Sequence, residues 1–444
     1  MDFHLTKEQL LVQKMYREFA ENEVKPLATE IDEEERFPME TVEKMAKLGM
    51  MGIYFPKEYG GAGADVLSYA MCVEELAKVC GTTAVIVSAH TSLCAAPIFE
   101  NGTEEQKMKY LPDLCSGRKI GAFGLTEPGA GTDAQGQQTT AVLDESGENY
   151  ILNGSKCFIT NGNVADTFVI IAVTGKVVDK RGRSMKEISA FIVEKDDKGF
   201  SQGKHEKKMG IRGSSTCDLI FEDCVIPKDR MLGKKGEGFK IAMKTLDGGR
   251  IGIASQALGI GEGAVDEAIK YTKERVQFGK RISQFQNTQF QLADMHTRME
   301  AAKYLVYSAA MKKQNHEPYS ADAAMAKLFA ALMPLPGFMC AFISATSSNV
   351  APAVEKPVEV LIKSASDLET ISHMRIFSSS LSRQVSIITL SVCPAQAALI
   401  ALISASTSSS RPSLSIPMLM TMSTSSAPFF TASAASNTFV SVVE

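Results

Sequence analysis

The segment Ala122–Ala134, with the sequence AFGLTEPGAGTDA, combines residue types that can surround a bound group. Its glycines let the backbone turn tightly and let N–H groups approach a ligand closely. Thr126 and Thr132 add hydroxyl groups, while Glu127 and Asp133 can fix the loop through hydrogen bonds. A Gly-rich acidic turn is, by itself, more often an ordinary surface loop. A ligand-binding role for this segment can therefore be inferred only together with the motifs that follow it.

Four further motifs follow along the chain. They are KCFITNG at Lys156–Gly162, KKMGIRGSSTCDLIFEDCVIP at Lys207–Pro227, LDGGR at Leu246–Arg250 and RVQFGKRISQFQ at Arg275–Gln286. Taken singly, KCFITNG is typical of a strand end with an Asn-Gly turn, and the last motif of a solvated helix face. A Gly-Gly pair inside a helix costs about 1 kcal/mol per residue against Ala, so the pair in LDGGR indicates close approach of a ligand.

In their order and spacing, the five motifs resemble the acyl-CoA dehydrogenase family, and within it the short-chain, butyryl-CoA members. The resemblance covers residues 1–331. It implies FAD-dependent α,β-dehydrogenation of a short-chain acyl-CoA thioester to the trans-2-enoyl-CoA. It also implies electron-transferring flavoprotein as the electron acceptor and a homotetramer as the assembly. An acyl-CoA oxidase is a weaker alternative, because oxidases share the flavin chemistry but are usually longer.

The resemblance assigns the site residues as well. Those matched to FAD contacts are Phe123, Leu125, Thr126, Gly131, Thr132, Phe158, Ile159, Thr160, Arg275 and Gln286. Those matched to acyl-CoA contacts are Thr132, Asp247, Gly248, Gly249 and Arg250. Arg275 and Gln286 match the pair that reaches the FAD of a neighbouring subunit, where Arg suits a bidentate phosphate contact. The family usually has Trp where Phe158 stands; Phe keeps the apolar body but lacks the indole donor.

The catalytic base of the family has no counterpart here. Short- and medium-chain members carry a catalytic Glu in an IYEGT segment after a Gly-Gly-rich flavin loop, and this sequence has neither segment. Other members carry the base on an earlier helix, where this chain has Gly249. The glutamates of the tail stand in no matching context; they are Glu355, Glu359, Glu369 and Glu444. We therefore predict no catalytic residue and impaired activity. The alternative is a non-catalytic flavin- or CoA-binding fragment, or a product that cannot assemble.

The periodicity of the sequence predicts the elements that must position these motifs. Residues 1–118 are expected to form a helical domain with capping boxes at Thr6 and Thr103. Residues 119–230 alternate with period two and predict a β-barrel-like domain. Residues 231–331 are expected to form a truncated helical bundle, with helices in 246–278, 284–314 and 319–330. The fold class is therefore α+β, with the acyl-CoA dehydrogenase order of helical, β and helical domains.

Residues 332–444 differ in character from the rest of the chain. Serine becomes frequent, Gly337 is the only glycine, and no periodicity is sustained. The strings PMLMTMSTSSAP at Pro417–Pro428 and KPVEVL at Lys356–Leu361 can be produced by reading deoxyribose-phosphate aldolase codons on the opposite strand. We hypothesise that this tail translates the wrong strand of such a gene and has no selected structure. Nucleotide sequence across the junction without an aldolase frame on the opposite strand would refute this.

Composition narrows the function class further. A net charge of −4 gives no reason to expect nucleic acid. The nine Cys are scattered without CxxC pairs, which favours reduced thiols of a cytoplasmic protein and no metal site. The start, MDFHLTKEQL, has no apolar signal segment, and no apolar run is long enough to span a membrane.

Overall fold

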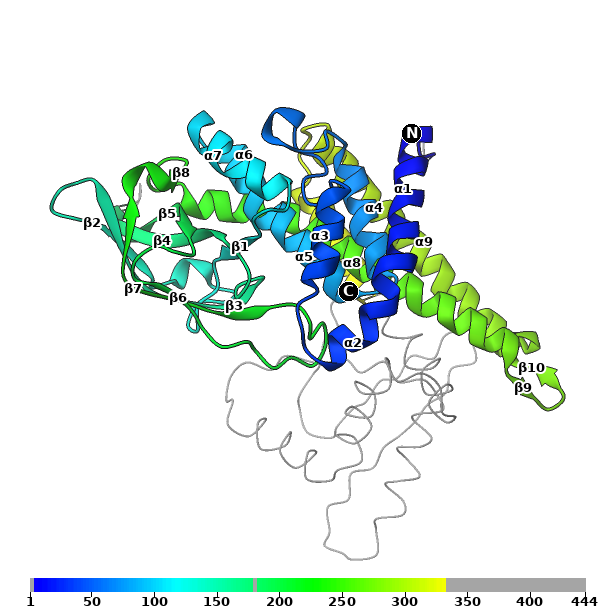
Figure 1. The fold of residues 1–444 in the computed structure, drawn as a ribbon. Helices are drawn as coiled ribbons and strands as arrows, with labels where there is room; N and C mark the ends of the chain where they lie inside the picture. The colour runs from blue at the N-terminus through cyan, green and yellow to red at the C-terminus, as the bar shows by residue number, and fades with distance from the viewer. Residues whose placement is uncertain (1–3, 179–181, 333–444) are drawn as a thin grey trace, which may run out of the picture. The chain divides into compact units, whose positions relative to one another are not determined.

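The computed structural model describes residues 4–178 and 182–332, which form a helical part, a sheet and a second helical part (Figure 1). The hypothesis about the tail therefore lies outside the described residues, except for Leu332. The helices of the first part are α1 Lys7–Phe19, α2 Ala28–Glu33, α3 Met39–Lys47, α4 Val66–Ala77, α5 Gly81–Ala89, α6 Ala96–Asn101 and α7 Glu104–Cys115.

Two helices of the first part begin where the sequence predicts. The Thr6 hydroxyl accepts from the Gln9 N–H at 3.1 Å, and the Gln9 side chain accepts from the Thr6 N–H at 2.9 Å. Thr103 and Gln106 repeat this reciprocal arrangement at the start of α7. Both capping boxes are confirmed, and each satisfies two N–H groups that a helix start leaves unpaired.

A continuous helical stretch from Gly81 to Asn101 crosses the core of the first part. It comprises α5, a π-helical segment at His90–Ala95 and α6. By length and composition it is apolar enough to cross a membrane, yet 83% of its apolar stretch is buried inside the protein. Such burial is typical of the core helix of a globular protein.

One eight-stranded sheet forms the second part. Its strands are β1 Gly121–Gly124, β2 Thr140–Leu143, β3 Asn149–Thr160, β4 Thr167–Val178, β5 Ser184–Glu194, β6 Phe200–Gln202, β7 Thr216–Pro227 and β8 Met231–Leu232. Their order is β6-β7-β3-β2-β4-β5-β8, with β1 also paired to β4. The sheet curls, and its pairs are antiparallel except where β1 and β2 meet β4. The predicted β-domain is thus confirmed as a mainly antiparallel sheet.

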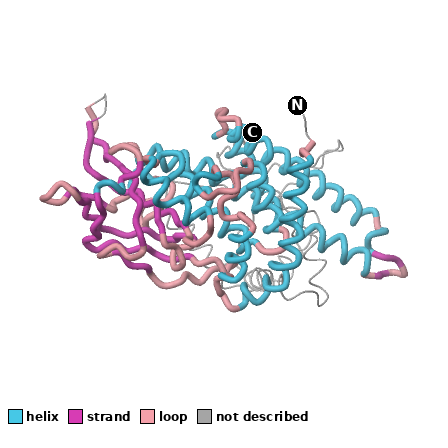
Figure 2. Tube along the Cα trace, turned by 45° about the horizontal axis from the view of Figure 1, so that its top comes forward, coloured by secondary structure: helices cyan, strands magenta, loops and turns pink. Residues whose placement is uncertain are grey.

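Three helices follow the sheet and pack against one another. They are α8 Gly238–Glu274, α9 Gln286–Gln314 and α10 Ser320–Leu332. The two-stranded hairpin of β9 Val276–Gln277 and β10 Lys280–Arg281 joins α8 to α9. In both views this hairpin lies at the end of the long helices away from the sheet (Figures 1 and 2). The first end of α8 lies against β5, so α8 connects the sheet with the helical part.

Candidate functional site

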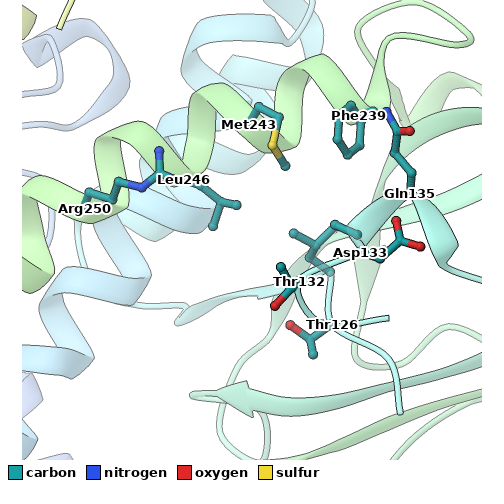
Figure 3. A pocket seen from close by; sticks show the side chains of 11 residues that line it. Thr126, Thr132, Asp133, Gln135, Phe239, Met243, Leu246 and Arg250 are labelled. Carbon is teal, nitrogen blue, oxygen red and sulfur yellow. The ribbon is translucent and has the colours of Figure 1, made fainter. Parts of the chain in front are cut away.

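A cavity of about 500 Å³ lies between the loop after β1 and one face of α8 (Figure 3). The loop contributes two hydroxyls, an acid and an amide, and α8 contributes mainly apolar side chains. The lining residues are Leu125, Thr126, Gly131, Thr132, Asp133, Ala134, Gln135, Phe239, Met243, Leu246 and Arg250. A cavity of this volume is in the range of small-molecule sites.

The α8 side of this cavity is a single helical stripe. Phe239, Met243, Leu246 and Arg250 follow one another at helical spacing, so they lie along one face of α8 (Figure 3). Our sequence reasoning assigned only Arg250 of these four to the site. The 3.6-residue period would have identified the others once the start of α8 at Gly238 was known.

A second cavity, of about 170 Å³, adjoins the first through Leu125, Thr126 and Leu246. Its remaining lining combines the KCFITNG motif with β1 and the buried helical stretch of the first part. These residues are Ala89, Leu93, Phe123, Phe158, Ile159 and Thr160. Ala89 and Leu93 were not predicted, because nothing in their apolar sequence context distinguishes a cavity wall from core.

Most of the predicted site residues therefore meet at these two cavities. Those that line at least one cavity are Phe123, Leu125, Thr126, Gly131, Thr132, Phe158, Ile159, Thr160 and Arg250. Thr126 and Thr132 both line the larger cavity from the loop, opposite α8 (Figure 3). Residues from motifs more than a hundred positions apart are thus brought to one place by the packing of α8 against the sheet.

Phe158 reaches the second cavity through an irregularity in β3. Lys156 pairs with Leu219 and Ile159 pairs with Cys217, so β3 has one more residue than β7 over this step. Such a β-bulge turns a side chain away from its ordinary direction. Phe158 has a φ of +59° and is 67% exposed, whereas Ile159 is buried. A left-handed backbone is unfavourable for an aromatic residue, and strain of this kind concentrates at functional sites.

The LDGGR motif places its acid and its arginine in contact. Arg250 donates a hydrogen bond to one oxygen of Asp247, and the Ser320 hydroxyl at the start of α10 donates to the other. Asp247 thus links the cavity-lining arginine to α10 without lining either cavity itself.

The Gly-Gly pair of α8 lies against the ends of two flexible side chains of the protein itself. A Cβ at Gly248 would lie 2.8 Å from Nζ of Lys313, and one at Gly249 would lie 2.7 Å from Cδ2 of Leu93. Side chains of the protein itself therefore occupy the space that the two glycines leave open. Lys313 is buried, and burial lowers its pKa against the opposing effect of Glu100, whose carboxylate is 3.6 Å away.

Arg275 and Gln286 line neither cavity. Arg275 is the residue at which α8 ends, and Gln286 begins α9 beyond the hairpin. At 1.5 Å per helical residue, Arg275 lies about 38 Å along α8 from Arg250. Within one chain, these two residues and the cavities are separate.

The cavities contain few groups that could accept a proton. Asp133 is the only carboxylate among the residues that line them. Gly249 supplies no side chain at the position where some members of the resembled family carry the base. Among the described residues, no group of three or more His, Cys, Asp and Glu could hold a metal ion.

The chemistry of the lining fits a flavin. Leu125, Phe123 and Phe158 offer an apolar wall for a flat ring system, while Thr126 and Thr160 offer hydroxyls for its polar edge. Added Cβ atoms at Gly129 and Gly131 would meet nothing within 4 Å, so the loop backbone is open to a ligand. A curled sheet between two helical parts, with such a cleft beside it, agrees with the three-domain, flavin-dependent oxidoreductase that the resemblance of the sequence implies.

Comparison with known proteins identifies the family. The models of the N-terminal, middle and C-terminal domains of acyl-CoA dehydrogenase match residues 6–118, 122–224 and 236–334, respectively. The chain belongs to the acyl-CoA dehydrogenase family, whose members are FAD flavoproteins.

Relatives of known identity agree with this assignment. The short-chain specific acyl-CoA dehydrogenase of Clostridium acetobutylicum is 65% identical over 331 residues, which are 74% of this chain and 86% of that protein. The solved butyryl-CoA dehydrogenase of Megasphaera elsdenii is 45% identical, with a TM-score of 0.76 over 86% of this chain and 99% of that one. A structure described as the electron transferring flavoprotein of Acidaminococcus fermentans is 51% identical, with a TM-score of 0.75 over 86% of this chain and 100% of that one.

Proposed function

We propose that this chain is built to dehydrogenate a short-chain acyl-CoA to the trans-2-enoyl-CoA and to pass the electrons to electron-transferring flavoprotein. The observation that carries the proposal is the meeting of the AFGLTEPGAGTDA and KCFITNG motifs with the apolar stripe of α8 at two adjoining cavities. The identity of the short-chain relatives supports the substrate class. The structure described for Acidaminococcus fermentans supports the electron acceptor.

The residues around the two cavities would hold the flavin. Thr126 and Thr160 would hydrogen-bond its polar edge, and Phe158 and Leu125 would pack against its ring. When bound, FAD supplies the acceptor for the hydride that leaves the β-carbon of the substrate. The apolar side chains of α8 would exclude water from the reacting centre, which strengthens every electrostatic interaction there.

The acyl-CoA would lie on the α8 side of the larger cavity. Thr132 would meet it from the loop and Arg250 from α8, both of which line that cavity. Asp247 keeps Arg250 in place through their hydrogen bond. Gly248 and Gly249 complete the segment that the resemblance assigns to this contact.

We further propose that the chain is impaired in the chemical step. The α-proton of a thioester needs a base within hydrogen-bond reach, and removal of a general base costs about a hundred- to ten-thousand-fold in rate. Gly249 provides no such group. The alternative is a non-catalytic flavin- or CoA-binding protein, which would use the same cavities. The bleaching experiment described below distinguishes it from an impaired dehydrogenase.

The oligomeric state and the cell compartment are proposed from the resemblance to acyl-CoA dehydrogenases and from the cysteines. We propose a homotetramer in which Arg275 and Gln286 contact the FAD of a neighbouring subunit, because both lie far from the cavities of their own chain. We place the protein in the cytoplasm, since all the cysteines of the described residues are free and buried.

Anaerobic mixing of FAD-supplemented protein with butyryl-CoA tests the proposal. We expect FAD to bind weakly and flavin bleaching to be slow by the hundred- to ten-thousand-fold cited for loss of a general base. A graft of an IYEGT-type C-terminal segment after Ala331 should restore fast bleaching. Rapid bleaching by the unaltered chain would contradict the impairment; Glu355 and Glu359 would then be the first residues to mutate. Slow bleaching that the graft leaves unchanged would favour the non-catalytic alternative.

A further inference from the structure

Lys156 on β3 is a fully buried cation at the base of the cavity loop. Its side chain is 0% exposed. Its Nζ donates to Oε1 of Glu127 at 2.7 Å, to Oε1 of Gln137 at 3.0 Å and to the carbonyl of Leu125 at 3.2 Å. An ammonium group has three N–H donors, so each of them has a partner within the same loop.

Glu127 closes the loop from the other side. Its Oε2 accepts from the N–H of Gln138 at 2.6 Å, and its Oε1 accepts from the N–H of Thr139 at 3.0 Å. Burial raises the pKa of Glu127, but the hydrogen bonds from Lys156, Thr139 and Gln138 outweigh burial and hold the pKa below its usual value. The expectation that Glu127 fixes this loop is thereby confirmed.

Together these groups form what we call the neck of the loop: the side chains of Glu127, Gln137 and Lys156. The neck joins residue 125, where the loop begins, to residue 139, where it ends. All the loop residues that line the larger cavity lie between these two points. A buried polar network of this kind rigidifies its surroundings when every member is satisfied.

Other hydrogen bonds of the loop do not involve Lys156. Glu127 and Ala130 exchange backbone hydrogen bonds, and the N–H of Cys157 donates to the carbonyl of Thr126 at 2.9 Å. The exposed Lys186 on β5 donates to the carbonyls of Gly136 and Gln137 at 2.9 and 2.6 Å. Lys186 therefore offers a control for the loss of a lysine that contacts the same loop from solvent.

We propose that Lys156 is a positioning residue: it fixes both ends of the loop, so that Thr126 and Thr132 are held in place for the cofactor and the acyl-CoA. The inference rests on the proposed function and deepens it, because it says that one buried ion pair keeps the ligand-binding loop ordered. Lys156 touches neither ligand; it acts through the neck.

The test compares the full-length chain with three variants. Lys156→Met alone leaves Glu127 buried without its cation, which is strongly destabilising. Lys156→Met with Glu127→Gln removes both charges and keeps an acceptor for the loop N–H groups. Lys186→Met is the matched control. For each we measure hydrogen exchange of the amides in 128–136 without added cofactor, the thermal unfolding midpoint and the Kd for FAD.

If the proposal is correct, the double variant unfolds within a few degrees of the wild type. Its loop amides nevertheless exchange about tenfold faster and its FAD Kd rises about tenfold, because the three buried hydrogen bonds that Lys156 donates are lost. Lys186→Met should change either quantity by less than about threefold, because water can replace the hydrogen bonds that this exposed ammonium donates to the carbonyls of Gly136 and Gln137. Unchanged loop exchange in a folded double variant would overturn the proposal and leave Lys156 a purely structural residue.

Two further results keep the test decisive. If the double variant does not fold, Gln137→Leu provides the test, because it leaves the ion pair intact but removes the hydrogen bonds of Gln137 with Lys156 and with the carbonyl of Ala134. It should raise loop exchange at least about threefold; no increase would refute the neck. If the wild type binds no FAD, the proposed function fails, while loop exchange still decides whether Lys156 orders the loop.

Discussion

Gly249 stands where some members of the family carry the catalytic base, and under the proposed impairment this position supplies none. The helix α8 is in place and Arg250 lines the larger cavity, but the neighbouring position has no side chain to take a proton. The nearest obstacle to a longer residue at this position is the end of the flexible Leu93 side chain, 2.7 Å from an added Cβ. The site can therefore be supplied with a carboxylate by local change.

The first prediction concerns this position. Gly249→Glu combined with Leu93→Ala should place a carboxylate beside the second cavity and raise the rate of flavin bleaching by butyryl-CoA by at least about a hundredfold, the low end of what a general base contributes. Gly249→Gln with Leu93→Ala is the control of equal size, and it should leave the rate at the level of the unaltered chain. Equal rates for Glu and Gln would show that this position does not face the α-carbon.

Phe158 carries a second consequence at this scale, because its backbone is left-handed at a φ of +59°. Phe158→Gly should relieve about 1 kcal/mol of strain relative to Phe158→Ala, since only Gly adopts this conformation without cost. Both variants lose the ring and should bind FAD more weakly than the wild type. Thermal unfolding of the two variants in parallel checks the difference. An Ala variant as stable as the Gly variant would mean that the bulge relaxes when the ring is removed.

At the scale of elements, periodicity and capping signals predicted most of the architecture. Helix starts at Thr6 and Thr103 and the switch to strand alternation near residue 120 are local signals, because each depends on residues a few positions apart. The bulge at Phe158, the neck at Lys156 and the stripe at Phe239 depend on pairing between distant segments. The sequence contains these residues but not their register, so their roles became visible only with the fold.

The packing of α8 against α4 illustrates such a non-local constraint. A Cβ at Gly259 would lie 2.2 Å from the carbonyl oxygen of Glu74 and 2.7 Å from Cβ of Ala77. Helix propensity favours Ala over Gly by about 1 kcal/mol, whereas overpacking against rigid backbone costs about 1–3 kcal/mol. Two buried helices cannot both keep their places after this change.

We therefore predict that Gly259→Ala lowers the free energy of unfolding by about 2 kcal/mol, despite its higher helix propensity. Gly210→Ala, where an added Cβ meets nothing within 4 Å, should stay within about 1 kcal/mol of the wild type. Urea titrations of both variants test this. A Gly259→Ala protein as stable as the wild type would show that α4 and α8 can separate slightly without cost.

At the scale of the whole molecule, a buried ionic cluster joins α4, α8 and α9. Lys303 contacts Glu262 at 2.6 Å and Glu74 at 3.4 Å, while Lys78 contacts Glu262 at 2.9 Å. The Tyr307 hydroxyl donates to Glu74 at 2.8 Å. Burial and the neighbouring Glu262 carboxylate raise the pKa of Glu74 to about 8, against the lowering effect of Lys303 and Lys78. The junction of three helices therefore favours a protonated Glu74 at neutral pH.

This raised pKa predicts how stability depends on pH. A carboxyl whose pKa is higher in the folded state stabilises the fold fully below its unfolded value of 4.5 and loses that contribution as pH rises through about 8. We expect the free energy of unfolding to fall by about 1.5 kcal/mol between pH 6.5 and pH 8, below the range in which the cysteines of the unfolded chain ionise. Burial lowers the pKa of His90 to about 4, so His90 changes the free energy of unfolding only below its unfolded pKa of 6.5, outside this range.

Denaturant titrations across this range, with variants at two adjacent acids of α4, check the assignment. Glu74→Gln mimics the protonated acid and should flatten the slope. Glu75→Gln, which breaks the ion pair with Arg17 at 2.8 Å, should keep the wild-type slope because Glu74 is still present. A slope that survives Glu74→Gln would assign the pH dependence to another group.

The length of α8 carries a consequence for genetics. Its 37 residues separate Arg250 from Arg275, so each chain carries cavity residues at one end and, under the proposed function, residues for another subunit's cavity at the other. A chain damaged at Thr126 and a chain damaged at Arg275 would then each fail alone. Co-expressed, the two alleles would complement each other, because a mixed assembly contains one cavity with both an intact Thr126 and an intact Arg275.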